Sequence, residues 1–221
     1  MKKVLYTVVL ISFLMGITVL TSVAASEHEA HHPTGEQTAT STSSERITAG
    51  MGHDMDLGPA DDTYDLRFID GMIIHHDGAV EMAREAQLKS QRPEVLALAD
   101  AVIAAQAEEI GLMTSWKKEW YPQADSTPAA YDPESGKTVP MTQAQITAMK
   151  MSGDLGGQDD QFDLRFIEAM IPHHQSAVDM ALDALAKTQR EEIRNLANEI
   201  IAAQETEINL MMSWKNLWYG R

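Results

Sequence analysis

The 221-residue chain contains no cysteine, which excludes disulfides, thiolate metal sites and a lipid anchor on cysteine. It is also poor in basic residues. There are 17 Lys and Arg against 33 Asp and Glu, and the net charge of −16 argues against binding to nucleic acid or to anionic membranes. No segment alternates apolar and polar residues as a half-buried strand does. If this protein binds soft metals, it must do so through methionine and histidine.

The chain does contain a long internal repeat. A histidine pair, His75-His76, lies in a segment that recurs 98 residues later around His173-His174. The match continues without a gap to Tyr121 and Tyr219. A period of this length predicts two tandem copies of one domain, because the repeats of solenoid proteins are only ~20–50 residues long.

Residues 1–25 have the pattern of a cleavable export signal. Lys2 and Lys3 precede an apolar run, and Val23-Ala24-Ala25 offers a cleavage site. An uncleaved membrane anchor is the alternative, although the apolar run is short for a bilayer span. We therefore expect a periplasmic or secreted protein that does not contact the membrane after cleavage.

The composition divides the rest of the chain into four segments. Residues 26–60 form a polar tail that contains His and Met and is expected to be disordered. Residues 61–121 and 159–221 are the two helical-hairpin repeats. Residues 122–158 are rich in proline and form a linker with one short helix.

Cleavage after Ala25 would place His28 third from the new amino terminus. There the free amine, two backbone amides and an imidazole can hold Cu(II) or Ni(II) in a square plane. The alternative is a soluble tail that binds metals weakly.

Each repeat is predicted to form two long helices. Asp61-Asp62 and Asp159-Asp160 are candidates for the first N-caps, and apolar residues follow at intervals of three and four. The second helices are expected to begin near Pro93 and near Glu191. Two antiparallel pairs predict an all-α four-helix bundle built from duplicated hairpins.

Histidine pairs flanked by methionines are the donors that copper prefers, Cu(I) above all. On a helical wheel the methionine before each pair lies in the middle of the buried stripe and the two histidines lie on its flanks. Buried imidazoles are unfavourable unless hydrogen-bonded or bound to metal. The alternative is ordinary packing, since methionine often fills cores. The candidate ligands are Met72, His75, His76, Met82 and Met113 in the first repeat, and Met170, His173, His174, Met180 and Met211 in the second.

Glu109 and Glu207 lie near the middle of the buried stripe on the second helices. They orient a histidine, bind metal directly, or are solvated on a rotated helix, and we favour the first. Pro172 directly precedes a histidine pair inside a predicted helix, where Ile74 stands in the other copy. Because proline removes a backbone N–H and bends a helix, we expect the two sites to differ.

The motif Met170-Ile171-Pro172-His173-His174-Gln175, followed by Ala177 and Met180, closely resembles the signature of the bacterial domain-of-unknown-function family 305. The closing Met-x-x-Trp of Met211 to Trp214 fits it too, and both repeats match. The resemblance implies a ferritin-like all-helical fold and, in some members, periplasmic copper binding in copper resistance. It implies Met and His ligands, which map onto Met170, His173, His174 and Met180, and onto Met72, His75, His76 and Met82.

The leading hypothesis is an exported copper-binding protein that sequesters or transfers Cu(I) and takes Cu(II) on its tail, contributing to copper tolerance. A periplasmic copper carrier or exporter is its candidate protein partner. The ligand set contains no nucleophile or phosphate loop, so we do not expect an enzyme. One alternative is a ferritin-like di-metal redox enzyme, which would need a Glu three residues before a histidine where this chain has Met or Ile. The other is a helical interaction module whose histidines sense pH.

Overall fold

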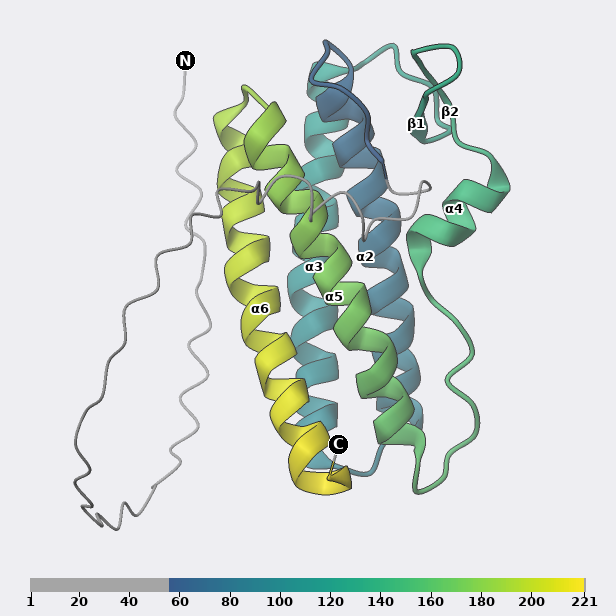
Figure 1. Ribbon diagram of the computed structural model, residues 1–221, viewed down its shortest axis with the longest axis vertical. Coiled ribbons are helices and arrows are strands. Elements are labelled where there is room, and N and C mark those ends of the chain that lie inside the picture. Colours follow the sequence, from purple (N-terminus) through teal and green to yellow (C-terminus); the bar gives the residue numbers. More distant parts are fainter. Residues whose placement is uncertain (1–55, 221) are drawn as a thin grey trace, which may run out of the picture. The chain divides into compact units, whose positions relative to one another are not determined.

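The computed structural model describes residues 56–220, which are mostly helical (Figure 1). The export signal and the tail with His28 lie outside the described residues. No helix in the described part is both long and apolar enough to cross a bilayer. The elements in chain order are α2 (Tyr64–Lys89), α3 (Pro93–Trp120), β1 (Ala129–Asp132), β2 (Lys137–Pro140), α4 (Gln143–Lys150), α5 (Phe162–Lys187) and α6 (Glu191–Tyr219).

The long helices form two hairpins, α2 with α3 and α5 with α6. The bounds of α5 lie 98 residues after those of α2, as the sequence repeat predicts. Pro93 occupies the first turn of α3, where its missing N–H is harmless. The expected aspartate caps are wrong, because Thr63 and Gln161 hold the N-cap positions and make no side-chain cap bond. Asp61 instead accepts from the Thr63 amide at 2.9 Å.

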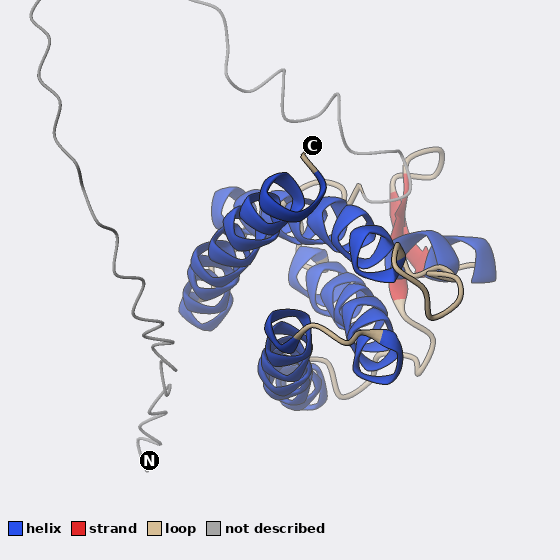
Figure 2. Ribbon diagram, turned by 90° about the horizontal axis from the view of Figure 1, so that it is seen from below, coloured by secondary structure: helices blue, strands red, loops and turns tan. Residues whose placement is uncertain are grey.

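The two hairpins meet mainly through α2 and α5, which run antiparallel (Figures 1 and 2). The approach is close at Gly78, where an added β-carbon would lie 3.1 Å from His173 Nε2. The described elements thus form two joined hairpins. The ferritin-like four-helix bundle remains a prediction.

The all-α prediction is wrong for the crossover between the hairpins, which contains a two-stranded sheet. β1 and β2 pair antiparallel, with Ala129 opposite Pro140 and Asp132 opposite Lys137. The connecting turn needs the left-handed backbone of Gly136, at φ 67°. Both β1 and α4 pack mainly on α2, the counterpart of α5, so the crossover makes the two halves unlike (Figure 1).

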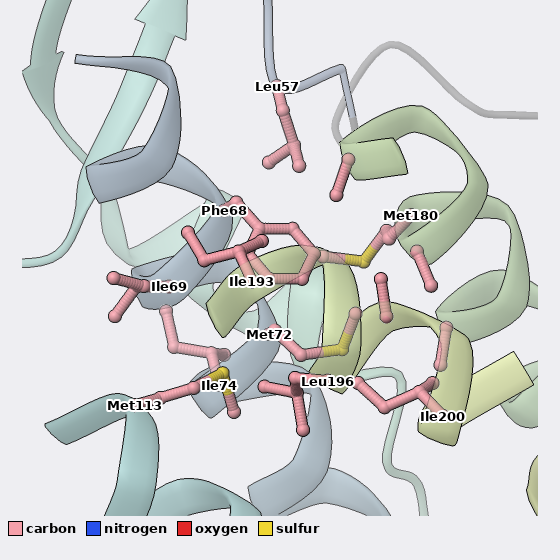
Figure 3. Close-up of a cluster of buried hydrophobic side chains, with 14 of the residues drawn as sticks. Leu57, Phe68, Ile69, Met72, Ile74, Met113, Met180, Ile193, Leu196 and Ile200 are labelled. Carbon is pink, nitrogen blue, oxygen red and sulfur yellow. The ribbon is translucent and has the colours of Figure 1, made fainter. Parts of the chain in front are cut away.

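Buried apolar side chains gather in two clusters. The first cluster surrounds the N-terminal half of α2 and the C-terminal half of α5, with residues from α6 and the crossover (Figure 3). The second cluster surrounds the C-terminal half of α2 and the N-terminal half of α5, with residues from α3. The antiparallel packing of α2 and α5 therefore makes each cluster from both hairpins.

Candidate metal centre

Each cluster contains three fully buried methionines from the predicted ligand set. The first cluster holds Met72 from α2, Met113 from α3 and Met180 from α5. The second cluster holds Met82, Met170 and Met211, from α2, α5 and α6.

The sequence placed two of these methionines with each histidine pair, and the structure does not bring those two together. Met72 and Met82 are ten residues apart on one helix, which is roughly 15 Å at 1.5 Å per residue, and they belong to different clusters. The same holds for Met170 and Met180 on α5.

The first cluster shows how thioethers from different helices enter one core. In Figure 3 the sulfur of Met180 reaches from α5 toward Phe68 of α2, while Met72 extends toward the α6 residues Leu196 and Ile200. The sulfur atoms are embedded among aliphatic side chains. Unbranched thioethers have three rotatable bonds, so their sulfurs can turn toward a common point without moving the backbone.

The first histidine of each pair faces its counterpart in the other hairpin. The rings of His75 and His173 lie 3.8 Å apart between centroids and are tilted by 44°. Neither ring nitrogen of His75 has a hydrogen-bond partner, and neither does His173 Nδ1, while His173 Nε2 lies 3.3 Å from the Lys150 carbonyl oxygen. Buried nitrogens without partners are unfavourable and rare, which marks this contact as a place where a ligand could be gained.

The second histidine of each pair faces a glutamate on the partner helix of its own hairpin. His76 Nε2 lies 2.6 Å from Glu109 Oε2, and His174 Nε2 lies 2.7 Å from Glu207 Oε2. A carboxylate only accepts hydrogen bonds, so Nε2 carries the proton in both rings. In the neutral form of the ring Nδ1 then carries the lone pair, and in both rings it is buried without a partner.

This arrangement favours one of the three alternatives for the glutamates, the one in which they orient a histidine. A carboxylate behind a histidine fixes the tautomer and raises the basicity of the nitrogen that binds metal. Met72 lies one helical turn before His76, and Met113 lies one turn after Glu109. The oriented nitrogen and two thioethers therefore come from neighbouring turns of α2 and α3.

Burial favours the neutral form of His75 and His173. Burial, followed by the neighbouring histidines, lowers the pKa of His75 well below its usual value. The same causes lower the pKa of His173 to about 3. Neutral imidazoles are the form that binds metal.

The donor set limits which metals can bind. Within residues 56–220, no three His, Asp or Glu side chains converge where they could hold a metal ion. The donors that the two clusters do offer are methionine sulfurs, which suit soft ions such as Cu(I) and not Mg²⁺ or Ca²⁺. Sequence reasoning missed two further methionines of the first cluster, Met141 and Met149. They lie in the crossover, and nothing in their local spacing signalled their position.

Known proteins share this architecture. Among curated proteins none matches the chain. Among solved structures, CopM in its Cu(II)-bound form is 35% identical, with 70% of this chain and 97% of that chain covered and a TM-score of 0.57. CopM in its Cu(I)-bound form is 33% identical over the same shares, with a TM-score of 0.54. A DUF305 protein from Streptomyces coelicolor is 27% identical over 66% of this chain and 88% of that one, with a TM-score of 0.50.

The family model described as "Domain of unknown function (DUF305)" matches residues 65–215. These residues run from the first turn of α2 to near the end of α6, and they include both histidine pairs and the six buried methionines of the predicted ligand set. The chain therefore belongs to the DUF305 family.

Proposed function

We propose that this protein binds Cu(I) at two sites, one at each cluster. The observation that carries the proposal is the buried, unpartnered Nδ1 of His76 and of His174, each held by a glutamate on Nε2. Three buried thioethers lie in each cluster, and one of them, Met72 or Met170, precedes the histidine by one helical turn. The likeness to CopM, which has been solved with Cu(I), Cu(II) and Ag bound, supports a copper-related role.

The chemistry of each site would follow from its donors. Neutral imidazole and neutral thioethers leave the charge of the ion in place, which favours a monovalent soft cation over a divalent one. The net charge of −16 gives the protein an attractive field for cations. The rings of His75 and His173 contact each other near the middle of α2 and α5. Either imidazole can supply a nitrogen ligand to a neighbouring site after its ring rotates.

The physiological role we propose is sequestration or transfer of copper outside the cytoplasm, contributing to copper tolerance. The export signal predicted in residues 1–25 supports a periplasmic or secreted location. The predicted Cu(II) site at His28 would capture the oxidised ion, and an exporter or copper carrier would be the exchange partner. We propose a binding protein, because the predicted ligands include no carboxylate nucleophile, no Ser-His-Asp arrangement and no phosphate loop.

The test is an anaerobic Cu(I) titration of the protein from Ser26 onward against a competing chelator. We expect one equivalent bound at each cluster. Met211→Leu keeps the shape of the side chain and removes a sulfur from the second cluster, so it should weaken one equivalent by at least about tenfold.

Met212→Leu is the matched control. Met212 follows Met211 directly, but its side chain is 54% exposed and belongs to neither cluster. It should bind copper like the unchanged protein. Equal titration curves for the two variants would reject the assignment of sites, and no binding by the unchanged protein would leave the histidines as core residues.

A further inference from the structure

The crossover places its sheet and α4 against the first cluster and contributes only Leu155 to the second. β1 and α4 pack on α2, and two crossover methionines, Met141 and Met149, are buried in the first cluster. In the described part of the chain the second cluster has no methionine beyond Met82, Met170 and Met211. The first cluster therefore has more thioethers than the second.

Met149 of α4 approaches Met180 of α5 over the surface of α2. A β-carbon placed on Gly71 would lie 3.3 Å from Met180 Cε and 3.5 Å from Met149 Cε. The methyl ends of the two thioethers thus border the same space, which a side chain at Gly71 would fill. At the matching position of α5, where no crossover methionine arrives, the chain has Ala169.

The end of α4 is fixed in place directly after Met149. The Lys150 carbonyl lies 3.3 Å from His173 Nε2 and against the surface of Gly78. Glu81 of α2 pairs with the Lys150 ammonium and accepts from Ser152 Oγ at 2.9 Å. Four contacts with α2 and α5 therefore determine where Met149 lies.

The other end of the crossover is also attached to α2. The buried carboxylate of Asp70 accepts from the Ala129 amide at 2.9 Å and pairs with Lys117 Nζ at 2.6 Å. Because both ends are held on α2, the segment between them forms a cover over the first cluster. Opening that cover would require breaking contacts at both ends.

We propose that Met149 is a fourth sulfur ligand for Cu(I) at the first cluster, which makes the two sites unequal. The inference rests on the proposed function and adds a ligand from the crossover. The first site holds Cu(I) more tightly than the second and releases it more slowly, because it has one more thioether and a cover. The second site, with three thioethers and only Leu155 from the crossover, is the one that exchanges copper readily.

The experiment isolates the first site by combining Met170→Leu with Met211→Leu. In that background, Met149→Leu should weaken Cu(I) binding by at least about tenfold in an anaerobic competition titration. X-ray absorption at the copper edge should lose one sulfur from the first coordination shell. Met151→Leu is the control, because Met151 lies two residues further on and belongs to neither cluster.

The possible failures are distinguishable. If the background protein binds no Cu(I), the proposed function fails at this cluster. If it binds Cu(I) and the Met149 and Met151 variants bind equally, the ligand inference is overturned. Weaker binding with an unchanged sulfur count also overturns it, since Met149 would then act only as a cover. Circular dichroism of the metal-free variants should show the same helix content and melting.

Discussion

The two histidines of each pair make different contacts. His75 contacts His173 of the opposite hairpin, whereas His76 is oriented by Glu109 within its own hairpin. Helical geometry explains the difference, because successive side chains are 100° apart and face different helices. The sequence predicted this split between two flanks of the stripe, and it also predicted that a glutamate would orient a histidine. Neither inference needed knowledge of the other hairpin.

Replacing Glu109 with Gln should weaken Cu(I) binding at the first cluster by about 10–100-fold. The amide can still reach His76, but it no longer requires the proton to be on Nε2, so Nδ1 is a poorer donor. A competition titration with Cu(I) checks this. Glu108→Gln is the control, because Glu108 is the neighbouring residue and is exposed.

The pairing of methionines could not be predicted at the level of residues. Met72 and Met180 share a cluster only because α2 and α5 run in opposite directions, and no local pattern carries that information. A repeat in sequence suggests that each copy contains a whole site. The structure instead divides each predicted set between two clusters.

Among the elements, the helices were predictable and the small sheet was not. α3 begins at Pro93 and α6 at Glu191, as their patterns predict, because these signals are local. β1 and β2 have four residues each, and β2 ends in a proline. Strands this short give no period-two pattern. β1 is held by the hydrogen bond from the Ala129 amide to Asp70 on α2. Asp70 lies outside the crossover, so the sequence of the crossover alone does not reveal this contact.

Three glycine substitutions test how closely these elements pack. Gly78→Ala should lower the free energy of unfolding by about 1–3 kcal/mol, because the new methyl group would lie 1.8 Å from the Lys150 carbonyl oxygen and must displace backbone. Gly111→Ala on α3 meets nothing within 4 Å and should raise it by about 0.5–1 kcal/mol through helix propensity. Urea unfolding of the metal-free protein measures both.

The free energy of unfolding of Gly71→Ala should lie between those of these two variants. Its nearest atoms, at 3.3 Å, are the flexible ends of Leu57 and Met180, which can move slightly. A loss of stability at Gly111 equal to that at Gly78 would contradict the packing of the crossover against α2.

The stability of the whole described fold should depend on pH through its buried histidines. Burial lowers the pKa of His75 well below its usual value and that of His173 to about 3, so the folded protein excludes protons that the unfolded chain accepts from about pH 6.5 downward. Their contribution is fully present above that pH and is lost as the pH falls toward 3. For each proton that the chain takes up on unfolding, the free energy of unfolding falls by about 1.4 kcal/mol per pH unit as the pH is lowered.

The measurement is urea unfolding of metal-free protein between pH 7 and pH 4.5 (about the range in which imidazoles of the unfolded chain titrate). His173→Gln should flatten the slope by about one proton, since its amide can replace the bond to the Lys150 carbonyl without titrating. Carboxylates contribute equally to the pH dependence of both proteins. The difference between the two slopes therefore gives the contribution of His173. Parallel curves would mean that His173 is protonated in the folded state.

The crossed arrangement of α2 and α5 has a consequence for assembly. Each cluster takes thioethers from both hairpins, so one hairpin by itself contains only part of either cluster. A chain with a single hairpin could assemble the same set of thioethers only by association with a second copy. Its metal binding would then depend on the square of protein concentration. With both hairpins in one chain, site formation is unimolecular, and the affinity for copper does not depend on the protein concentration.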